Sequence, residues 1–200
     1  MVIDPRFIYL AVALSALGAF GYVRDTLRGV TSPNRVTWSL WAVEGVLGFA
    51  VEIQQHVGLA SLMTLMLGLA PFAVVVASFK NPNGVWALGA FDITCGAIAL
   101  VGLSFWAFVD EPTVALVAFV AADQVASWPT VRKSWQAPTS ESAGVFLLGS
   151  INCAITILTL HAITTAGALF PGCVFVTDLL MSVLILTRVG PRLRAGAHPR

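Results

Sequence analysis

Long apolar stretches separated by short polar breaks make up most of this 200-residue chain. A transmembrane helix needs about 20 predominantly apolar residues, and the pattern predicts seven such spans. They cover residues 5–23, 36–53, 57–79, 85–109, 113–130, 143–162 and 167–187. The sequence therefore predicts an all-α polytopic membrane protein with seven transmembrane helices.

Lys and Arg residues are distributed unevenly over the breaks between these spans. All eleven except Arg6 lie in the first, third and fifth breaks or in the C-terminal tail, which are expected on one side of the membrane. Cytoplasmic loops carry an excess of Lys and Arg. We therefore expect an integral protein of the plasma membrane with its N-terminus outside and its C-terminus in the cytoplasm. Arg132 and Lys133 are predicted to anchor the fifth break at the cytoplasmic surface.

Composition narrows the classes of function. Hydrophobic residues make up 58% of the chain and charged residues only 10%, whereas soluble domains are about 25% charged. The chain has no block of basic residues of the kind that binds nucleic acid, so nucleic acid is not expected as a partner. The sequence has no HExxH, GxSxG or Walker motif, so we expect neither an enzyme nor a cofactor or metal site.

The chain also contains an internal repeat at an offset of 108 residues. The segment YVRDTLRGVTSPNRVTWSL (22–40) aligns without a gap on TVRKSWQAPTSESAGVFLL (130–148). The identical pairs are Val23/Val131, Arg24/Arg132, Thr31/Thr139, Ser32/Ser140 and Leu40/Leu148. The same offset lays the first three spans on the last three and leaves the fourth unmatched.

This arrangement predicts two parallel three-helix bundles joined by a linker helix, because one extra span restores the orientation of the second copy. The predicted parts are a first repeat (1–80), a linker helix (81–112), a second repeat (113–187) and a basic cytoplasmic tail (188–200).

The segment SWPTVRKSWQAPTSESAGVF resembles the PQ-loop signature, with Pro129-Thr130 at the place of its Pro-Gln pair. The seven-helix plan is similar to that of the SWEET sugar carriers and the PQ-loop transporters. The resemblance implies transport by alternating access, with a hinge at Pro129 and at its counterpart Gly21. It also implies that acids of the second half, here Asp123 and Asp178, couple transport to protons.

Four carboxylic acids are predicted inside spans, namely Glu44, Asp92, Asp123 and Asp178. Ionisable residues inside a membrane are costly unless they are paired or hydrated, and they often mark substrate or proton pathways. The alternative is a neutral acid that is hydrogen-bonded between helices. For Asp92, in the linker helix, we favour a structural role.

The repeat also brings polar faces of two helices into correspondence. Trp41, Glu44 and Gly48 align with Gly149, Asn152 and Thr156, and steps of three and four keep each set on one helical face. This pattern predicts a substrate pathway lined by Trp41, Glu44, Gly149, Asn152 and Thr156. The alternative is close helix packing through glycines, with Asn152 bonded across helices.

The sequence thus favours a carrier for a small polar solute that works by alternating access, with proton coupling at Asp123 and Asp178 as one option. Its expected partners are the lipid bilayer and an unidentified solute. The sequence leaves open whether the protein forms a homo-oligomer. The alternative is a membrane receptor or assembly partner that keeps the same fold without transporting.

Overall fold

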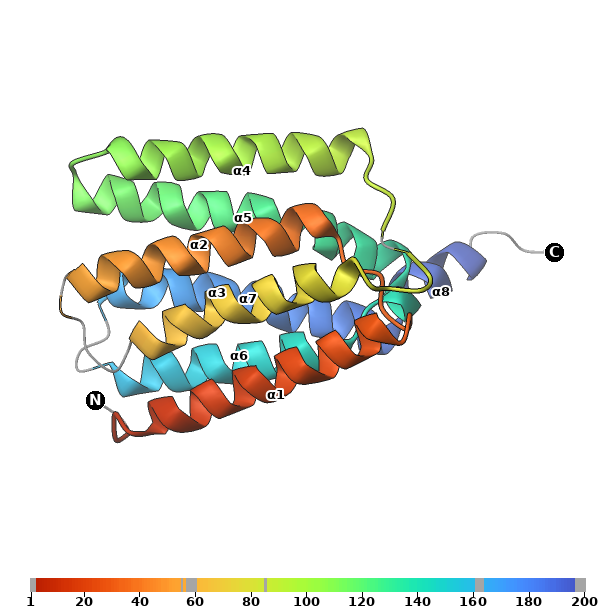
Figure 1. The fold of residues 1–200 in the computed structure, drawn as a ribbon, viewed down its shortest axis with the longest axis horizontal. Helices are drawn as coiled ribbons and strands as arrows, with labels where there is room; N and C mark the ends of the chain where they lie inside the picture. The colour runs from red at the N-terminus through yellow and green to blue at the C-terminus, as the bar shows by residue number, and fades with distance from the viewer. Residues whose placement is uncertain (1–2, 55, 57–60, 85, 161–163, 197–200) are drawn as a thin grey trace.

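The computed structural model describes residues 3–54, 56, 61–84, 86–160 and 164–196. This part of the chain is helical throughout its regular structure, as predicted (Figure 1). The α-helices are α1 (Phe7–Leu27), α2 (Arg35–Gln54), α3 (Ser61–Ser78), α4 (Ala90–Phe108), α5 (Pro112–Gln136), α6 (Ala143–Thr159), α7 (Thr165–Thr187) and α8 (Val189–Gly196). A 3₁₀-helix, η2 (Pro138–Ser140), joins α5 to α6.

Five of these helices, α1, α3, α4, α5 and α7, are long and apolar enough to cross a membrane. Their large apolar side chains are widely exposed, for example Phe20 at 70%, Phe72 at 57% and Phe108 at 86%. A soluble monomer rarely exposes apolar patches on this scale. The structure therefore agrees with an integral, multi-pass membrane protein. The other two predicted spans correspond to α2, which carries Arg35, Glu44 and Glu52, and to the 17-residue α6.

Three predicted boundaries were wrong. The first span was predicted to end at residue 23, but α1 continues to Leu27. The fourth span was predicted from residue 85, but α4 begins at Ala90, and Asp92 lies in its first turn rather than inside the span. The fifth span was predicted to end at residue 130, but α5 continues through Pro129 to Gln136. The first residues of the third predicted span, 57–60, lie outside the described residues, as does the end of the tail, 197–200.

The long helices lie side by side, and successive helices run in opposite directions (Figure 1). α3 packs against both α1 and α2, and α7 packs against both α5 and α6. α1 also packs against α6, α2 packs against α5, and α4 lies against α5 and α2. Gly45 of α2 faces Gly68 of α3 with no room for a side chain between them, which allows the two helix backbones to approach closely.

We call the end at which α1, α3, α5 and α7 finish the basic end. It lies at the right of Figure 1, together with α8. Next to it lies a buried core cluster of Tyr22, Trp38, Val74, Phe146, Met181 and Ile185, against which Trp41 packs. The Tyr22 and Trp38 rings lie 4.6 Å apart between centroids. Bulky aromatic side chains from α1, α2 and α6 therefore fill the interior beneath the basic end.

Candidate functional site

Three predicted acids from three helices come together inside the bundle. We call Glu44 of α2, Asp123 of α5 and Asp178 of α7 the acid cluster. The Glu44 and Asp123 carboxyl groups face each other, and Asp178 is close enough to interact electrostatically with Asp123. Glu44 and Asp123 are only 3% and 4% exposed. Neither oxygen of Glu44 has a donor among the described residues, because the group that faces it is another carboxyl.

Neighbouring side chains hold the acid cluster in place. The amide Nε2 of Gln124 donates to Asp123 Oδ2 at 2.9 Å, while the Thr177 hydroxyl donates to Gln124 Oε1 at 2.6 Å. The Trp41 side chain lies beside the Asp123 carboxyl. Gly149 of α6 faces the Asp178 carboxyl so closely that a Cβ atom there would overlap it. The structure thus brings Trp41 and Gly149, both predicted for the pathway, to the acids.

The remaining pathway residues form a second polar contact on α6. Asn152 is 2% exposed, and its amide Nδ2 donates to the Ser15 hydroxyl of α1 at 2.7 Å. The Thr156 hydroxyl donates to the Asn152 carbonyl at 3.0 Å. Asn152 and Gly149 are three positions apart on one helix, so this contact lies about one turn from the acid cluster.

The two polar contacts are related by the 108-residue offset. Ser15 corresponds to Asp123, and Asn152 corresponds to Glu44. The α1–α6 crossing therefore places a hydroxyl against an amide where the α5–α2 crossing places two carboxyls against each other.

A second pair of contacts follows the same offset. A Cβ atom on Gly18 would lie 3.2 Å from the Cα atom of Val145, and the Thr37 hydroxyl donates to the Ala126 carbonyl at 2.8 Å. Gly18 corresponds to Ala126, and Val145 to Thr37. The α1–α6 and α5–α2 crossings thus share a register, although their chemistry differs.

The predicted hinge positions lie inside unbroken helices. Pro129 is fully buried within α5, and Gly21 lies within α1 with open space where a Cβ atom would be. α5 continues past Pro129 without a break, although proline has no backbone N–H to donate within the helix. The hinge role of both residues stays a prediction.

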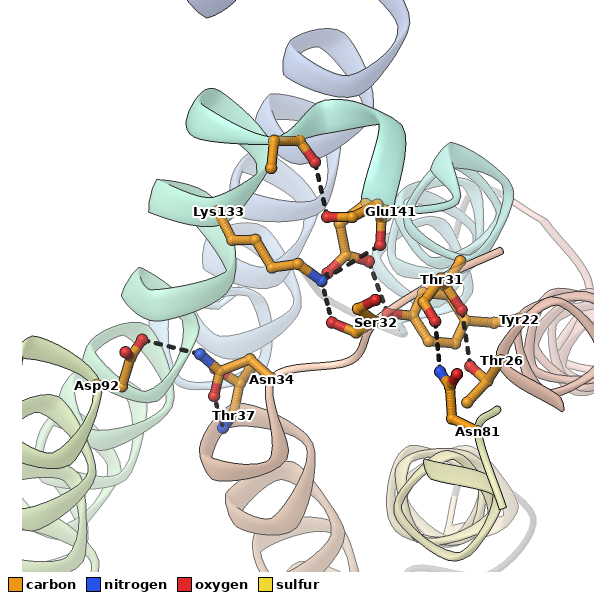
Figure 2. Close-up of polar contacts among 12 residues, drawn as sticks. Tyr22, Thr26, Thr31, Ser32, Asn34, Thr37, Asn81, Asp92, Lys133 and Glu141 are labelled. Carbon is orange, nitrogen blue, oxygen red and sulfur yellow. Dashed lines mark hydrogen bonds and ion pairs between the residues drawn. The ribbon is translucent and has the colours of Figure 1, made fainter. Parts of the chain in front are cut away.

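The prediction for Lys133 was wrong, because this residue is not an anchor at the membrane surface. It is fully buried, and its Nζ lies 2.7 Å from Glu141 Oε1 (Figure 2). Lys133 also donates to the carbonyls of Ser32 and Ser140, and the Tyr22 hydroxyl donates to Glu141 Oε2 at 2.6 Å. We call these five residues the Lys133 network. Arg132, in contrast, is exposed, and its role as an anchor stays a prediction.

The Lys133 network lies where the two copies of the repeated loop meet. The Ser32 amide donates to the Ser140 carbonyl at 3.0 Å, and these serines correspond under the offset. Glu141 was not among the predicted functional residues. The signal that could have found the network is the buried face of α5, since Ala126, Pro129 and Lys133 are spaced by three and four.

Asp92 has a structural role at the basic end. Its Oδ2 accepts from the Gly89 amide at 2.7 Å at the start of α4. Its Oδ1 accepts from Asn34 Nδ2 at 2.8 Å (Figure 2). The Asn34 side-chain oxygen in turn accepts from the Val36 amide at the start of α2. The pair thus joins the first turns of two helices by capping both.

Two cavities of about 140 and 420 Å³ occur near the basic end, and no acid-cluster residue lines either of them. Glu44 and Asp123 are buried in this conformation, whereas Asp178 is partly exposed.

Comparisons with protein-family models, with curated proteins and with solved structures found no match to this chain.

Proposed function

We propose that this protein is a membrane carrier for a small polar solute that works by alternating access. The observation that carries the proposal is the acid cluster. Its Glu44–Asp123 pair is buried where helices from the two halves of the chain cross, and Glu44 lacks a hydrogen-bond donor among the described residues. A buried polar group without a partner is costly, and such groups inside a membrane typically serve a substrate or ion path.

The carrier comprises two three-helix units, α1–α3 and α5–α7, joined by α4. Support for this division comes from the packing, since α3 lies against both other helices of its unit and α7 does the same in the second. Further support comes from the Ser15–Asn152 and Asp123–Glu44 contacts, which follow the repeat offset. Counting α2 and α6 among the spanning helices gives the seven-span plan.

In this proposal, movement of the two units relative to each other exposes the acid cluster to one side at a time. The Lys133 network and the aromatic core cluster close the basic end here. The opposite movement separates the two repeated loops and opens a path from the basic end to Trp41 and Glu44.

Proton coupling follows from the chemistry of paired acids. Two carboxyl groups that face each other in a dry interior repel when both are charged, and a proton shared between them removes that repulsion. Glu44 and Asp123 are arranged in this way, and Asp178 adds a third acid. Release of the shared proton to one side would accompany movement of the solute.

The basic end faces the cytoplasm of the plasma membrane in this proposal, and the N-terminus lies outside. The described Lys and Arg residues other than Arg6 lie toward that end, and α8 adds Arg192 and Arg194 there. The positive-inside rule gives this orientation.

A receptor or assembly partner without transport activity is the second candidate. The burial of the pathway residues favours it, since Glu44 and Asn152 are 3% and 2% exposed and neither lines the two hollows near the basic end.

An uptake screen with the purified protein in liposomes separates the two candidates. Candidate solutes are tested at two pH values with the natural protein and with Glu44→Gln, Asp178→Asn and, as a control, Asp110→Asn at an exposed acid. The carrier proposal expects uptake that the first two substitutions abolish and the third leaves unchanged. Uptake that persists in both acid variants would refute the mechanism, and a screen in which no solute moves would favour the receptor.

A further inference from the structure

An apolar groove of about 420 Å³ follows one face of α5 on the lipid-exposed surface. Its floor includes Trp128, Arg132 and Trp135, spaced by four and three along the helix, and its walls include Phe91 of α4 and Leu180 of α7. Every lining residue apart from Arg132 is Val, Leu, Phe or Trp. Trp128 and Leu180 are 53% and 43% exposed, so a molecule from the surrounding bilayer has direct access to the groove.

Arg132 is the positive charge of this groove. Its guanidinium carbon lies 4.6 Å from the centroid of the Phe91 ring, and the residue is exposed. In the described part of the chain, the ion pairs are Arg24–Asp25 and Lys133–Glu141. Arg132 therefore has no carboxylate partner there, although it stands beside apolar surface.

The same arginine also lines the polar cavity of about 140 Å³ on the other side of its side chain. Gln136, Lys133 and Asp92 share that cavity. Lys133 is neutralised by Glu141, and both Asp92 oxygens already accept hydrogen bonds. Arg132 is thus the charged group still free to bind a ligand at the junction of an apolar groove and a polar cavity.

The end of the groove meets further positive charge. Gly190 of α8 packs against the backbone carbonyl of Trp135, and the same short helix carries the exposed Arg192 and Arg194. Basic residues beside a membrane-spanning helix attract anionic lipids, and basic pockets between such helices bind their headgroups.

We propose that this groove binds one membrane phospholipid with an anionic headgroup. An acyl chain lies on the face of α5 between α4 and α7, the phosphate meets the Arg132 guanidinium, and the polar end of the headgroup enters the cavity beside Gln136. From Trp128 to Trp135 the floor is about 10 Å long at 1.5 Å per residue. That length fits the upper part of a lipid chain and is short for a partner helix.

The test uses the purified full-length protein in detergent, with native mass spectrometry and the thermal unfolding midpoint as readouts. Phosphatidylglycerol, phosphatidylcholine of the same chain length and glycerol 3-phosphate are titrated separately. We expect one retained phosphatidylglycerol that raises the midpoint and binds about tenfold more tightly than phosphatidylcholine, the ratio that about 1.4 kcal/mol represents. Glycerol 3-phosphate, which lacks chains, should have no effect.

Three variants locate the site. Arg132→Gln should remove the preference for phosphatidylglycerol, and Leu180→Trp should fill the groove and weaken both lipids. Arg28→Gln, at an exposed arginine that ends α1 on the same end of the molecule, should change neither. Equal binding of the two lipids, an effect of glycerol 3-phosphate, or an equal loss in Arg28→Gln would overturn the proposal. None of these outcomes bears on transport, so the lipid site and the carrier are tested independently.

Discussion

The acid cluster and the Lys133 network both join the two halves of the chain, and each contains a buried pair, Glu44–Asp123 in one and Lys133–Glu141 in the other. They differ in how well their polar atoms are satisfied. Lys133 has an ion-pair partner and two carbonyl acceptors, and Glu141 receives a second donor from Tyr22. Glu44, in contrast, has no donor among the described residues and faces another acid. A fully satisfied group fixes one conformation, whereas an unsatisfied group is stabilised only when a proton or ligand arrives.

The comparison therefore predicts a mainly structural role for the Lys133 network and, under the proposed function, a role in uptake for the acid cluster. Substitutions in the Lys133 network should chiefly lower the free energy of unfolding. Substitutions in the acid cluster should change uptake with little loss of stability.

The largest effect is expected from Lys133→Ala. It leaves the buried Glu141 carboxylate without its cation, and breaking a buried pair in this way costs about 3–5 kcal/mol. The unfolding midpoint in detergent measures the loss. Arg132→Gln, at the exposed neighbouring position, is the matched control and should change stability little in lipid-free detergent. A small shift in Lys133→Ala would show that the network does not hold the basic end together.

Gly149→Ala should give the next largest effect. The added Cβ overlaps the Asp178 carboxyl, and such overpacking costs about 1–3 kcal/mol. Gly21→Ala is the matched control, because open space surrounds that position and alanine is favoured in a helix interior by about 0.5–1 kcal/mol. The two variants should therefore shift the unfolding midpoint in opposite directions. Shifts of the same sign would contradict the close approach of Asp178 to α6.

Glu44→Gln should raise stability slightly, because the new amide can donate to Asp123 and make a hydrogen bond worth about 1 kcal/mol. Asn152→Ala, at the corresponding position of the other crossing, removes the bond to Ser15 and should lower stability by about the same amount. Chemical unfolding of both variants tests the signs. A clear loss of stability in Glu44→Gln would mean that Glu44 has a structural partner.

The smallest effect is expected from Glu111, an exposed acid that serves as a reference for the buried ones. Hydrogen bonds from the Val114 and Thr113 amides at the start of α5 lower the pKa of this carboxyl. Its stabilising contribution is therefore complete above the ordinary carboxyl pKa and is lost as the pH falls through the lowered value. The difference in unfolding midpoint between the natural protein and Glu111→Gln should shrink in acid. A constant difference across that range would exclude the titration of Glu111 as its cause.

The sequence predicted the helices well because long apolar runs have few other solutions in a membrane. It misplaced the end of α5 because proline usually disrupts a helix interior. The structure keeps the helix intact, and the Thr37 hydroxyl supplies a donor to the Ala126 carbonyl nearby. The prediction from the sequence also placed Asp92 inside a span, because residues 85–89 carry no signal for the later start of α4.

The candidate site could be predicted only in part from the sequence. Spacing by three and four placed Glu44 with Trp41 and Asn152 with Gly149, since residues on one helical face are set by local geometry. Which helices face each other depends on packing between distant segments. The contact between Glu44 and Asp123, which are 79 positions apart, therefore came only from the folded chain.

By itself the sequence determined the helical architecture, the uneven distribution of charge and the 108-residue repeat, because these depend on local composition and spacing. Only the tertiary structure decided that Lys133 is buried while Arg132 is exposed. The physical reason is that a buried charge needs partners. The partners of Lys133 come from two loops about 100 positions apart that meet only when the two halves of the chain pack together.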